Sequence, residues 1–208
     1  MGDAIKSQSG FTIAELLVST ALSLMVLAGV YTVFRSQTHT VKAQEEHMEA
    51  HEYALAVIDL MVREIRNAGY FPTGTACTNV ANTAGVVSAS STSLRFVYDS
   101  NGDGNCEEDI TYSFTGSNIT RTYNGSTETL TDGNVTAFTF TYFPQQTSGT
   151  APSALTCSTT CNSTELAQIQ KVRIGITVQS QNTDSEFGGG RSVDMSVNAD
   201  LRNRGLSA

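Results

Sequence analysis

A lone carboxylate, Glu15, lies near the start of a long apolar run that begins directly after Gly10. The next charged residue along the chain is Arg35. Since a charged side chain in hydrocarbon costs roughly 2.5 to 3.5 kcal/mol on insertion scales, we expect Glu15 to have a charged partner. The chemistry open to this segment is therefore the pairing of a carboxylate with a cation in apolar surroundings.

A second group of polar residues could bind calcium, which takes about six to eight oxygen ligands. Oxygen-bearing side chains alternate along this segment, with glycines between them. The predicted ligands are Asp99, Asn101, Asp103, Asn105 through its main-chain carbonyl, and Glu108 or Asp109 as the closing carboxylate. An EF-hand would carry its bidentate glutamate where this chain has Ile110. The segment is therefore interpreted either as a calcium loop or as a polar Asn/Asp/Gly hairpin between two strands.

Four cysteines lie beyond the apolar run: Cys77, Cys106, Cys157 and Cys161. An even number of cysteines in an exported domain favours disulfides. Three pairings are possible, and proximity in sequence favours Cys157 with Cys161, which leaves Cys77 with Cys106. The short paired spacings of a zinc site are absent from the sequence.

The composition argues against two classes of function. The chain has 208 residues, a formal net charge of −8 and no evident basic patch, so we do not predict nucleic-acid binding. Its three histidines lie in one expected helix, away from any serine or cysteine arrangement suited to nucleophilic catalysis. We expect a structural protein rather than an enzyme, with no cofactor apart from the candidate calcium ion.

A long N-terminal helix carries the lone carboxylate. The uncharged residues 16–34 would cover about 28 Å as a helix, close to the ~30 Å hydrocarbon core of a bilayer. An apolar stripe at helical spacing follows, and the pattern ends at Gly69 and Pro72. Its members are Met48, His51, Leu55, Ile58, Val62 and Ile65. We expect a leader peptide in residues 1–10, a membrane or filament-core helix in 11–35 and an amphipathic helix in 36–70.

Beyond the helix, the apolar period changes to two, which indicates β-strands. The alternating residues lie within 94–98, 112–114, 138–142, 174–178 and 193–201. Asn124-Gly125 predicts a hairpin, whereas residues 145–163 and 180–190 are expected to be loops. The expected fold class is α+β, with one antiparallel sheet laid across the helix and a β-rich globular head in residues 71–208.

The segment Ser9-Gly10-Phe11-Thr12-Ile13-Ala14-Glu15, followed by Leu16, Leu17 and Val18, resembles the processing site of type IV pilins and type II secretion pseudopilins. The resemblance implies that prepilin peptidase cuts after Gly10, that Phe11 is then N-methylated and that Glu15 is used in filament assembly. Glu15 would pair with the α-amino group of Phe11 on a neighbouring subunit and fix the axial register. The type IV pilin fold is also implied.

Three further segments look like PilW-type minor pilins, namely residues 63–71, 96–104 and 201–204. The resemblance implies a minor pilin in pilus assembly or initiation, with the tip as a candidate position and twitching motility and cell adhesion as candidate processes. A minor pseudopilin of the J type in type II secretion and a calcium-dependent adhesive tip subunit are the alternatives.

The implied partners are prepilin peptidase, other major and minor pilins and an inner-membrane assembly platform. The implied location is the inner membrane, crossed once, with the head in the periplasm before assembly and in the pilus or at the cell surface afterwards.

Overall fold

The computed structural model describes residues 10–72, 77, 85–146, 151–157, 159–180 and 190–203. The chain falls into two compact units that divide between Gln44 and Glu45, and the first helix, α1 (Ile13–Ile65), belongs to both. Each unit is described by itself. We call the described residues 10–44 the N-terminal unit and the described residues from 45 onwards the head.

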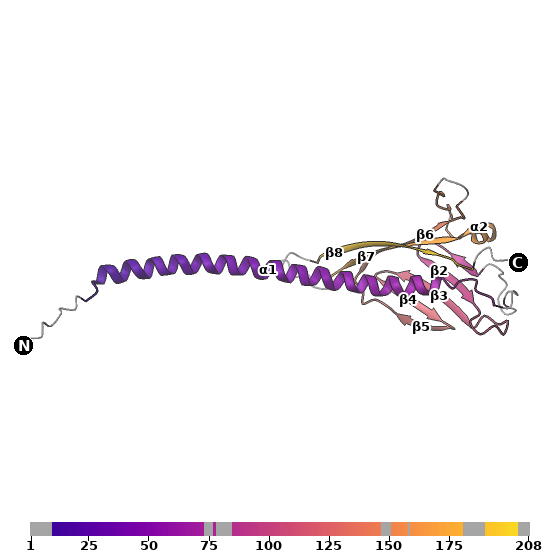
Figure 1. Ribbon diagram of the computed structural model, residues 1–208, viewed down its shortest axis with the longest axis horizontal. Coiled ribbons are helices and arrows are strands. Elements are labelled where there is room, and N and C mark those ends of the chain that lie inside the picture. The colour runs from indigo at the N-terminus through magenta and orange to yellow at the C-terminus, as the bar shows by residue number, and fades with distance from the viewer. Residues whose placement is uncertain are drawn as a thin grey trace, which may run out of the picture. The chain divides into compact units, whose positions relative to one another are not determined.

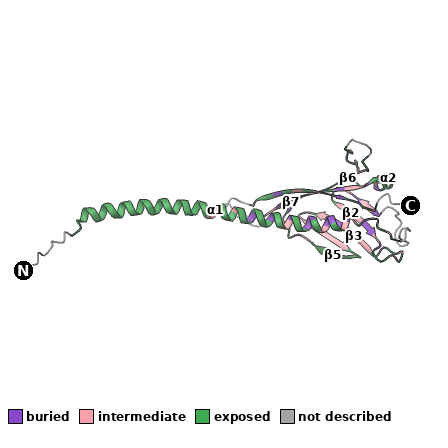
Figure 2. Cartoon of the chain, viewed as in Figure 1, coloured by how far each residue is buried: buried purple, intermediate pink, exposed green. Residues whose placement is uncertain are grey.

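The N-terminal unit exposes its apolar side chains. From Phe11 to Phe34 every large apolar side chain is exposed, by at least the 57 % of Val33. Figure 2 shows this part of α1 in the colour of exposed residues. Among the described residues, α1 is the helix long and apolar enough by length and composition to cross a membrane.

The hydroxyl groups within this apolar run bond to the helix itself. Ser19 and Thr20 donate to carbonyls three residues back, each over 2.9 Å. Ser23 donates to the Ser19 carbonyl over 2.7 Å and Thr32 to the Gly29 carbonyl over 2.8 Å. Each of these four serine and threonine hydroxyls therefore has an acceptor within the helix itself.

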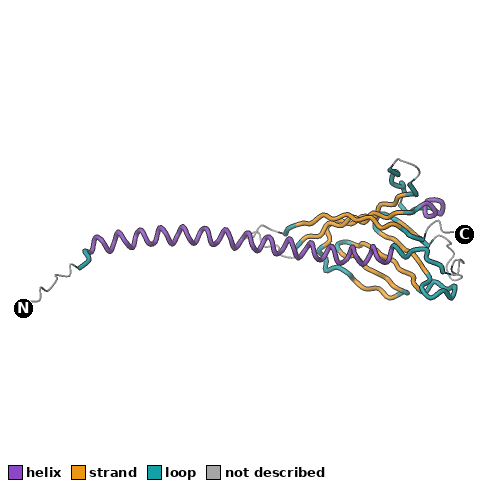
Figure 3. Tube along the Cα trace, viewed as in Figure 1, coloured by secondary structure: helices purple, strands orange, loops and turns teal. Residues whose placement is uncertain are grey.

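The head combines the second half of α1 with two antiparallel sheets (Figure 1). The five-stranded sheet has the order β1-β2-β3-β4-β5, and the three-stranded sheet has the order β6-β7-β8. The strands are β1 (Val86–Ala89), β2 (Ser93–Tyr98), β3 (Glu108–Thr115), β4 (Asn118–Tyr123), β5 (Ser126–Thr129), β6 (Val135–Phe143), β7 (Lys171–Gln179) and β8 (Ser192–Asp200). A short helix, α2 (Ser163–Gln168), lies in the β6–β7 connection (Figure 3).

The α+β fold class of a long helix packed against antiparallel strands is confirmed, but the expectation of one sheet is wrong. The buried positions of α1 spread over roughly half of the helix circumference at 3.6 residues per turn. This face is wide enough to contact two sheets, and side chains from α1 and both sheets form one hydrophobic core. The aromatic rings of Phe138 and Phe140 contact one another in this core, with centroids 4.8 Å apart.

The buried side of α1 also differs from the expected stripe. Met48 and Leu55 are 60 % and 42 % exposed, whereas Ala50 and Ala54 are buried. Ile58, Val62 and Ile65 are buried as expected. Small residues thus form part of the buried face where the apolar pattern had favoured larger ones.

The end of the helical segment is fixed by two glycines with positive φ, Gly69 (74°) and Gly85 (79°). The Gly69 amide donates to the Val97 carbonyl over 3.0 Å, and the Val97 amide donates to the Gly85 carbonyl over 2.8 Å. A Cβ atom on Gly85 would lie 2.2 Å from the Gly69 nitrogen. This approach requires glycine, and it attaches the end of the helical segment to β2.

The hairpin at Asn124-Gly125 is confirmed. It joins the antiparallel strands β4 and β5, and its two central residues have φ values of 48° and 81°. Positive φ at both positions is the requirement of a type I′ turn, and Asn-Gly is the sequence that meets it at least cost.

Candidate processing and assembly site

The predicted cleavage site lies just before the first helical residue. Gly10 and Phe11 have no regular secondary structure, and the Phe11 side chain is 87 % exposed. No atom of another residue would lie within 4 Å of a Cβ atom on Gly10. Among the described residues, a second molecule can therefore approach Gly10 from the side on which a Cβ atom would lie.

Glu15 closes a capping box at the start of α1. One of its carboxylate oxygens accepts hydrogen bonds from the Thr12 amide and the Thr12 hydroxyl, both over 3.0 Å. In return, the Glu15 amide donates to the Thr12 hydroxyl oxygen over 3.2 Å. The exchange satisfies two amides that a helix start would otherwise leave unpaired, and it places a negative charge at the positive end of the helix.

The sequence carries the signal for this contact, because Thr-x-x-Glu before an apolar run is the pattern of a capping box. Our interpretation from the sequence assigned Glu15 only a partner on another subunit. Within a single chain, the carboxylate already has a role in fixing the first turn of the helix.

The polar loop after β2 is organised around Asp99, which is 1 % exposed. Its two carboxylate oxygens accept from the amides of Gly102 (2.7 Å) and Gly104 (2.9 Å). The Asn101 side-chain oxygen accepts from the Asp103 amide over 3.0 Å, and that of Asp103 accepts from the Asn105 amide over 2.8 Å. The loop is thus closed by side-chain to main-chain contacts of its own.

The acidic residues that follow have other partners. The Asp109 carboxylate accepts two hydrogen bonds from Arg95, of 2.9 and 2.6 Å, and so has a partner outside the loop. Glu108 accepts from the amide of Ser100 over 3.1 Å and from its hydroxyl. The hydrogen bonds that Arg95 donates to Asp109 hold the pKa of Arg95 above its ordinary value. The two interpretations of the loop, as a calcium site and as a polar hairpin, both stay predictions.

Among the described residues, one group of three side chains could hold a metal by proximity, with ligand atoms within 4.8 Å of one another. It consists of Cys157, Cys161 and Glu165. The two sulfurs of this group are joined in a disulfide, so they are not free to bind a metal.

The structure contains the two disulfides that sequence proximity favours, Cys77–Cys106 and Cys157–Cys161. Their Cα atoms lie 5.3 and 4.5 Å apart, respectively, within the usual range. Cys77 and Cys106 form a small second core with Val97, next to the loop that Asp99 organises. This disulfide thus links the segment after α1 to the β2–β3 connection.

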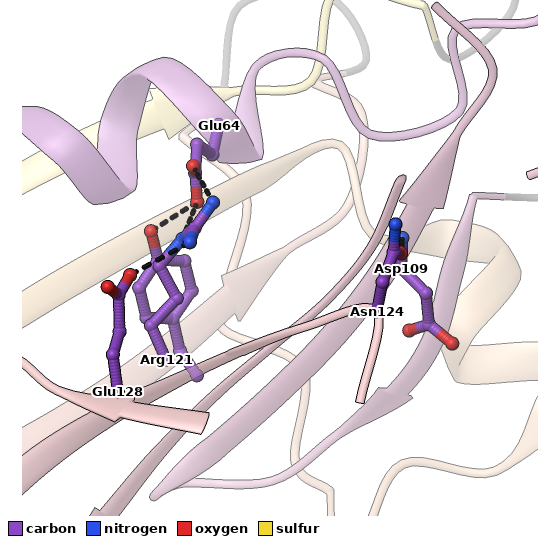
Figure 4. A network of polar contacts seen from close by, with 6 residues as sticks. Glu64, Asp109, Arg121, Asn124 and Glu128 are labelled. Carbon is purple, nitrogen blue, oxygen red and sulfur yellow. Dashed lines mark hydrogen bonds and ion pairs between the residues drawn. The ribbon is translucent and has the colours of Figure 1, made fainter. Parts of the chain in front are cut away.

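An ion-pair network that the sequence analysis did not predict joins α1 to the five-stranded sheet. Figure 4 shows Arg121 of β4 between Glu64 of α1 and Glu128 of β5. The guanidinium donates to both carboxylate oxygens of Glu64, over 3.0 and 2.6 Å, and the Tyr112 hydroxyl donates to the same carboxylate. The Glu64 and Arg121 side chains are only 15 % and 17 % exposed.

The surroundings of this network perturb its acid–base equilibria. Hydrogen bonding to Glu64 raises the pKa of Arg121 above its ordinary value. Burial raises the pKa of Tyr112, and its hydrogen bond to Glu64 raises it further. Both shifts favour the protonated forms of Arg121 and Tyr112, in which each donates to the Glu64 carboxylate.

The comparisons with known proteins agree with these features. The family described as prepilin peptidase-dependent protein B matches residues 43–199, and the prokaryotic N-terminal methylation motif matches residues 5–31. Among solved structures, the type IV-like pilin TTHA1219 from Thermus thermophilus is similar, at 12 % identity, 74 % coverage of this chain, 95 % of that chain and a TM-score of 0.44. No curated protein sequence matches. The chain is a type IV pilin-like structural protein and belongs to the prepilin peptidase-dependent protein B family.

Proposed function

We propose that this protein is a minor pilin of a type IV pilus, which uses its N-terminal helix to join the filament and carries its head outwards. The observation that carries the proposal is the exposure of every large apolar side chain from Phe11 to Phe34, by 57 % to 87 %. Burying such a surface is worth about 25 cal/mol per Å². In the proposed sequence of events, lipid covers it first and neighbouring helices cover it later.

Processing would create the partner of Glu15. Cleavage after Gly10 converts the Phe11 amide into an α-amino group, which is positively charged at neutral pH. On a neighbouring subunit, this ammonium would lie in the same apolar core as the Glu15 carboxylate. Pairing the two avoids an uncompensated charge there, which would cost several kcal/mol.

Within the chain, Thr12 competes with the neighbouring ammonium for the Glu15 carboxylate. The Glu15 oxygen that accepts from Thr12 would have to share or exchange that contact when the neighbouring ammonium arrives. The ammonium carries a full positive charge, which attracts the carboxylate more strongly than the neutral Thr12 donors do in apolar surroundings. Sharing of the carboxylate between the two partners would keep the helix start during assembly.

The proposed assembly pathway involves the periplasmic head, prepilin peptidase, the other pilins and the inner-membrane assembly platform. The head would face the periplasm before assembly and the cell exterior afterwards. A role in initiation, with a position near the tip, fits a head whose described residues form eight strands and two disulfides better than repetition along a whole shaft.

The test compares two substitutions of Glu15 in full-length protein. Glu15→Gln keeps an oxygen that can accept from Thr12 but removes the charge, whereas Glu15→Val removes both. We expect both variants to be inserted and processed, yet absent from sheared filaments in immunoblots. Normal incorporation of Glu15→Gln would contradict the ion pair, and loss of incorporation for Glu15→Val alone would assign the role to the cap.

Genetics separates the pilus from the secretion system. We expect a deletion strain to lose surface pili or twitching while exporting folded proteins normally. A strain that keeps its pili but fails to export folded proteins would instead assign the chain to a pseudopilus.

A further inference from the structure

The connection between β6 and β7 covers the outer edge of the five-stranded sheet. The Cys161 amide donates to the Ala89 carbonyl over 2.8 Å, on the side of β1 that does not pair with β2. Both residues are buried, with 5 % and 1 % exposure. The outer edge of β1 is therefore covered by the segment around Cys161, which is one of the two cysteines of the Cys157–Cys161 disulfide.

The residues that follow hold this segment in place. Asn162 caps α2 in a complete capping box with Glu165, and Leu166 of α2 is buried in the main core. Helix α2 contacts β1 directly. We call residues 159–169 the edge clasp, because they close over the edge of β1.

The Cys157–Cys161 disulfide lies at the start of the edge clasp. Its partners are only four residues apart, so it closes a short loop and constrains the unfolded chain less than a long-loop disulfide does. The Cys77–Cys106 disulfide, by contrast, spans a separation of 29 residues. The short disulfide therefore acts mainly on local conformation, and the local conformation here is the approach of Cys161 to β1.

The two disulfides also differ in their access to solvent. Cys77 and Cys106 are 6 % and 4 % exposed, and both lie in the second core. Cys157 is half-buried and lies at the surface end of its pair. Since exchange begins with attack of a thiolate on an accessible sulfur, an external dithiol reaches the Cys157–Cys161 bond first.

We propose that Cys157–Cys161 is a redox-sensitive latch that helps to hold the edge clasp on β1, so that reduction of the disulfide loosens the cover over the edge of the five-stranded sheet. Two successive exchanges with a dithiol break the S–S bond and yield two cysteine thiols and the cyclic disulfide of the reagent. When the disulfide forms again, the two cysteine thiols transfer two electrons and two protons to the disulfide of another protein in the compartment that receives the exported head. An unpaired strand edge invites pairing with another chain, so oxidation after export would remove that hazard.

The test uses folded full-length protein in detergent micelles with stepwise addition of dithiothreitol. Free thiols are alkylated and assigned by peptide mass spectrometry. We expect Cys157 and Cys161 to be labelled about tenfold faster than Cys77 and Cys106. The Cys77–Cys106 bond lies in the second core, so the dithiol can reach it only after local unfolding around that core. Equal rates, or earlier labelling of Cys77 and Cys106, would overturn the proposed access.

Hydrogen exchange on the selectively reduced protein tests the latch itself. We expect the amides of Cys161 and Leu166 to exchange about tenfold faster, while those of β3 and β7 stay unchanged. Cys157→Ser with Cys161→Ser should reproduce this pattern if the variant folds, and reduction of already folded protein gives the result if it does not. Unchanged exchange in the clasp, or faster exchange throughout the head, would overturn the proposal.

Discussion

The two halves of α1 bury their side chains in opposite ways. All eight buried residues of the helix lie in the head half, from Glu46 to Ile65, whereas the helical residues of the N-terminal unit bury none. The half with the larger apolar side chains is the exposed one. Burial in this helix thus follows the availability of a partner, and the N-terminal half finds none among the described residues of its own chain.

The same contrast holds for the polar groups. In the head, the carboxylates of Glu64, Asp99 and Asp109 all have partners within the chain. In the N-terminal unit, the carboxylate of Glu15 is bonded only to the start of its own helix among the contacts described. One half of the molecule is complete by itself, and the other is built for contact with something else.

The largest effect is expected from a substitution in the N-terminal unit, whose apolar side chains are exposed. Gly10→Val should abolish processing, because the peptidase must fit around a residue that lacks a side chain. Intact-mass measurement of membrane-extracted protein distinguishes the uncut chain from one that starts at Phe11. Gly29→Val is the matched control, since Gly29 also has nothing within 4 Å, and it should be processed normally. A start at any other residue would contradict the assigned site.

In the self-contained head, the largest effect is expected where two main chains meet. Gly85→Ala combines a positive φ with a contact of 2.2 Å to Gly69, and it should lower the free energy of unfolding by about 4 kcal/mol. Urea denaturation followed by near-ultraviolet circular dichroism measures this change. Gly104→Ala, with a φ of 86° in open space, should cost only about 1 to 2 kcal/mol. Equal losses would show that the close contact has no effect of its own.

Removal of the cation between α1 and β4 should have a somewhat smaller effect. Arg121→Met leaves the Glu64 carboxylate largely buried without its ion pair, and we expect a loss of about 3 kcal/mol. Arg63→Met is the control, because the Arg63 and Asp59 side chains are 75 % and 57 % exposed and their pair should contribute less than about 0.5 kcal/mol. The same denaturation experiment compares them, and similar losses would argue against the network as a link to the helix.

Calcium should have the smallest effect, if the head is as complete as its contacts indicate. We expect millimolar calcium and a chelator to give the same melting curve, since the Asp99 oxygens already accept two amides and Asp109 is paired with Arg95. Asp99→Asn should lower the melting temperature with or without calcium. A rise in melting temperature that grows with free calcium would show that the head, too, needs a partner from outside.

Local patterns in the sequence predicted the features that depend on neighbouring residues. The Asn124-Gly125 hairpin, the alternating faces of the strands and the end of the helical pattern near Gly69 all follow from residue type and spacing. The Thr12-x-x-Glu15 cap has an equally local signature. It was missed because the charge of Glu15 had already been assigned a distant role.

Features that depend on packing between remote segments could not be predicted in this way. Glu64 and Arg121 are 57 positions apart, and nothing in either local sequence identifies the other as its partner. Ala50 and Ala54 are weak signals in an apolar pattern, yet both are buried in the core. The split into two sheets depends on the width of that contact, which helical spacing alone does not define.

The hydroxyls of Ser19, Thr20, Ser23 and Thr32 donate to carbonyls of their own helix. These four hydroxyls keep their acceptors when the surroundings of the helix change. Their contribution to the transfer free energy then nearly cancels. In the proposed assembly, extraction from a bilayer into a fibre would exchange one apolar environment for another around these groups, and a small difference in packing would be enough to direct it.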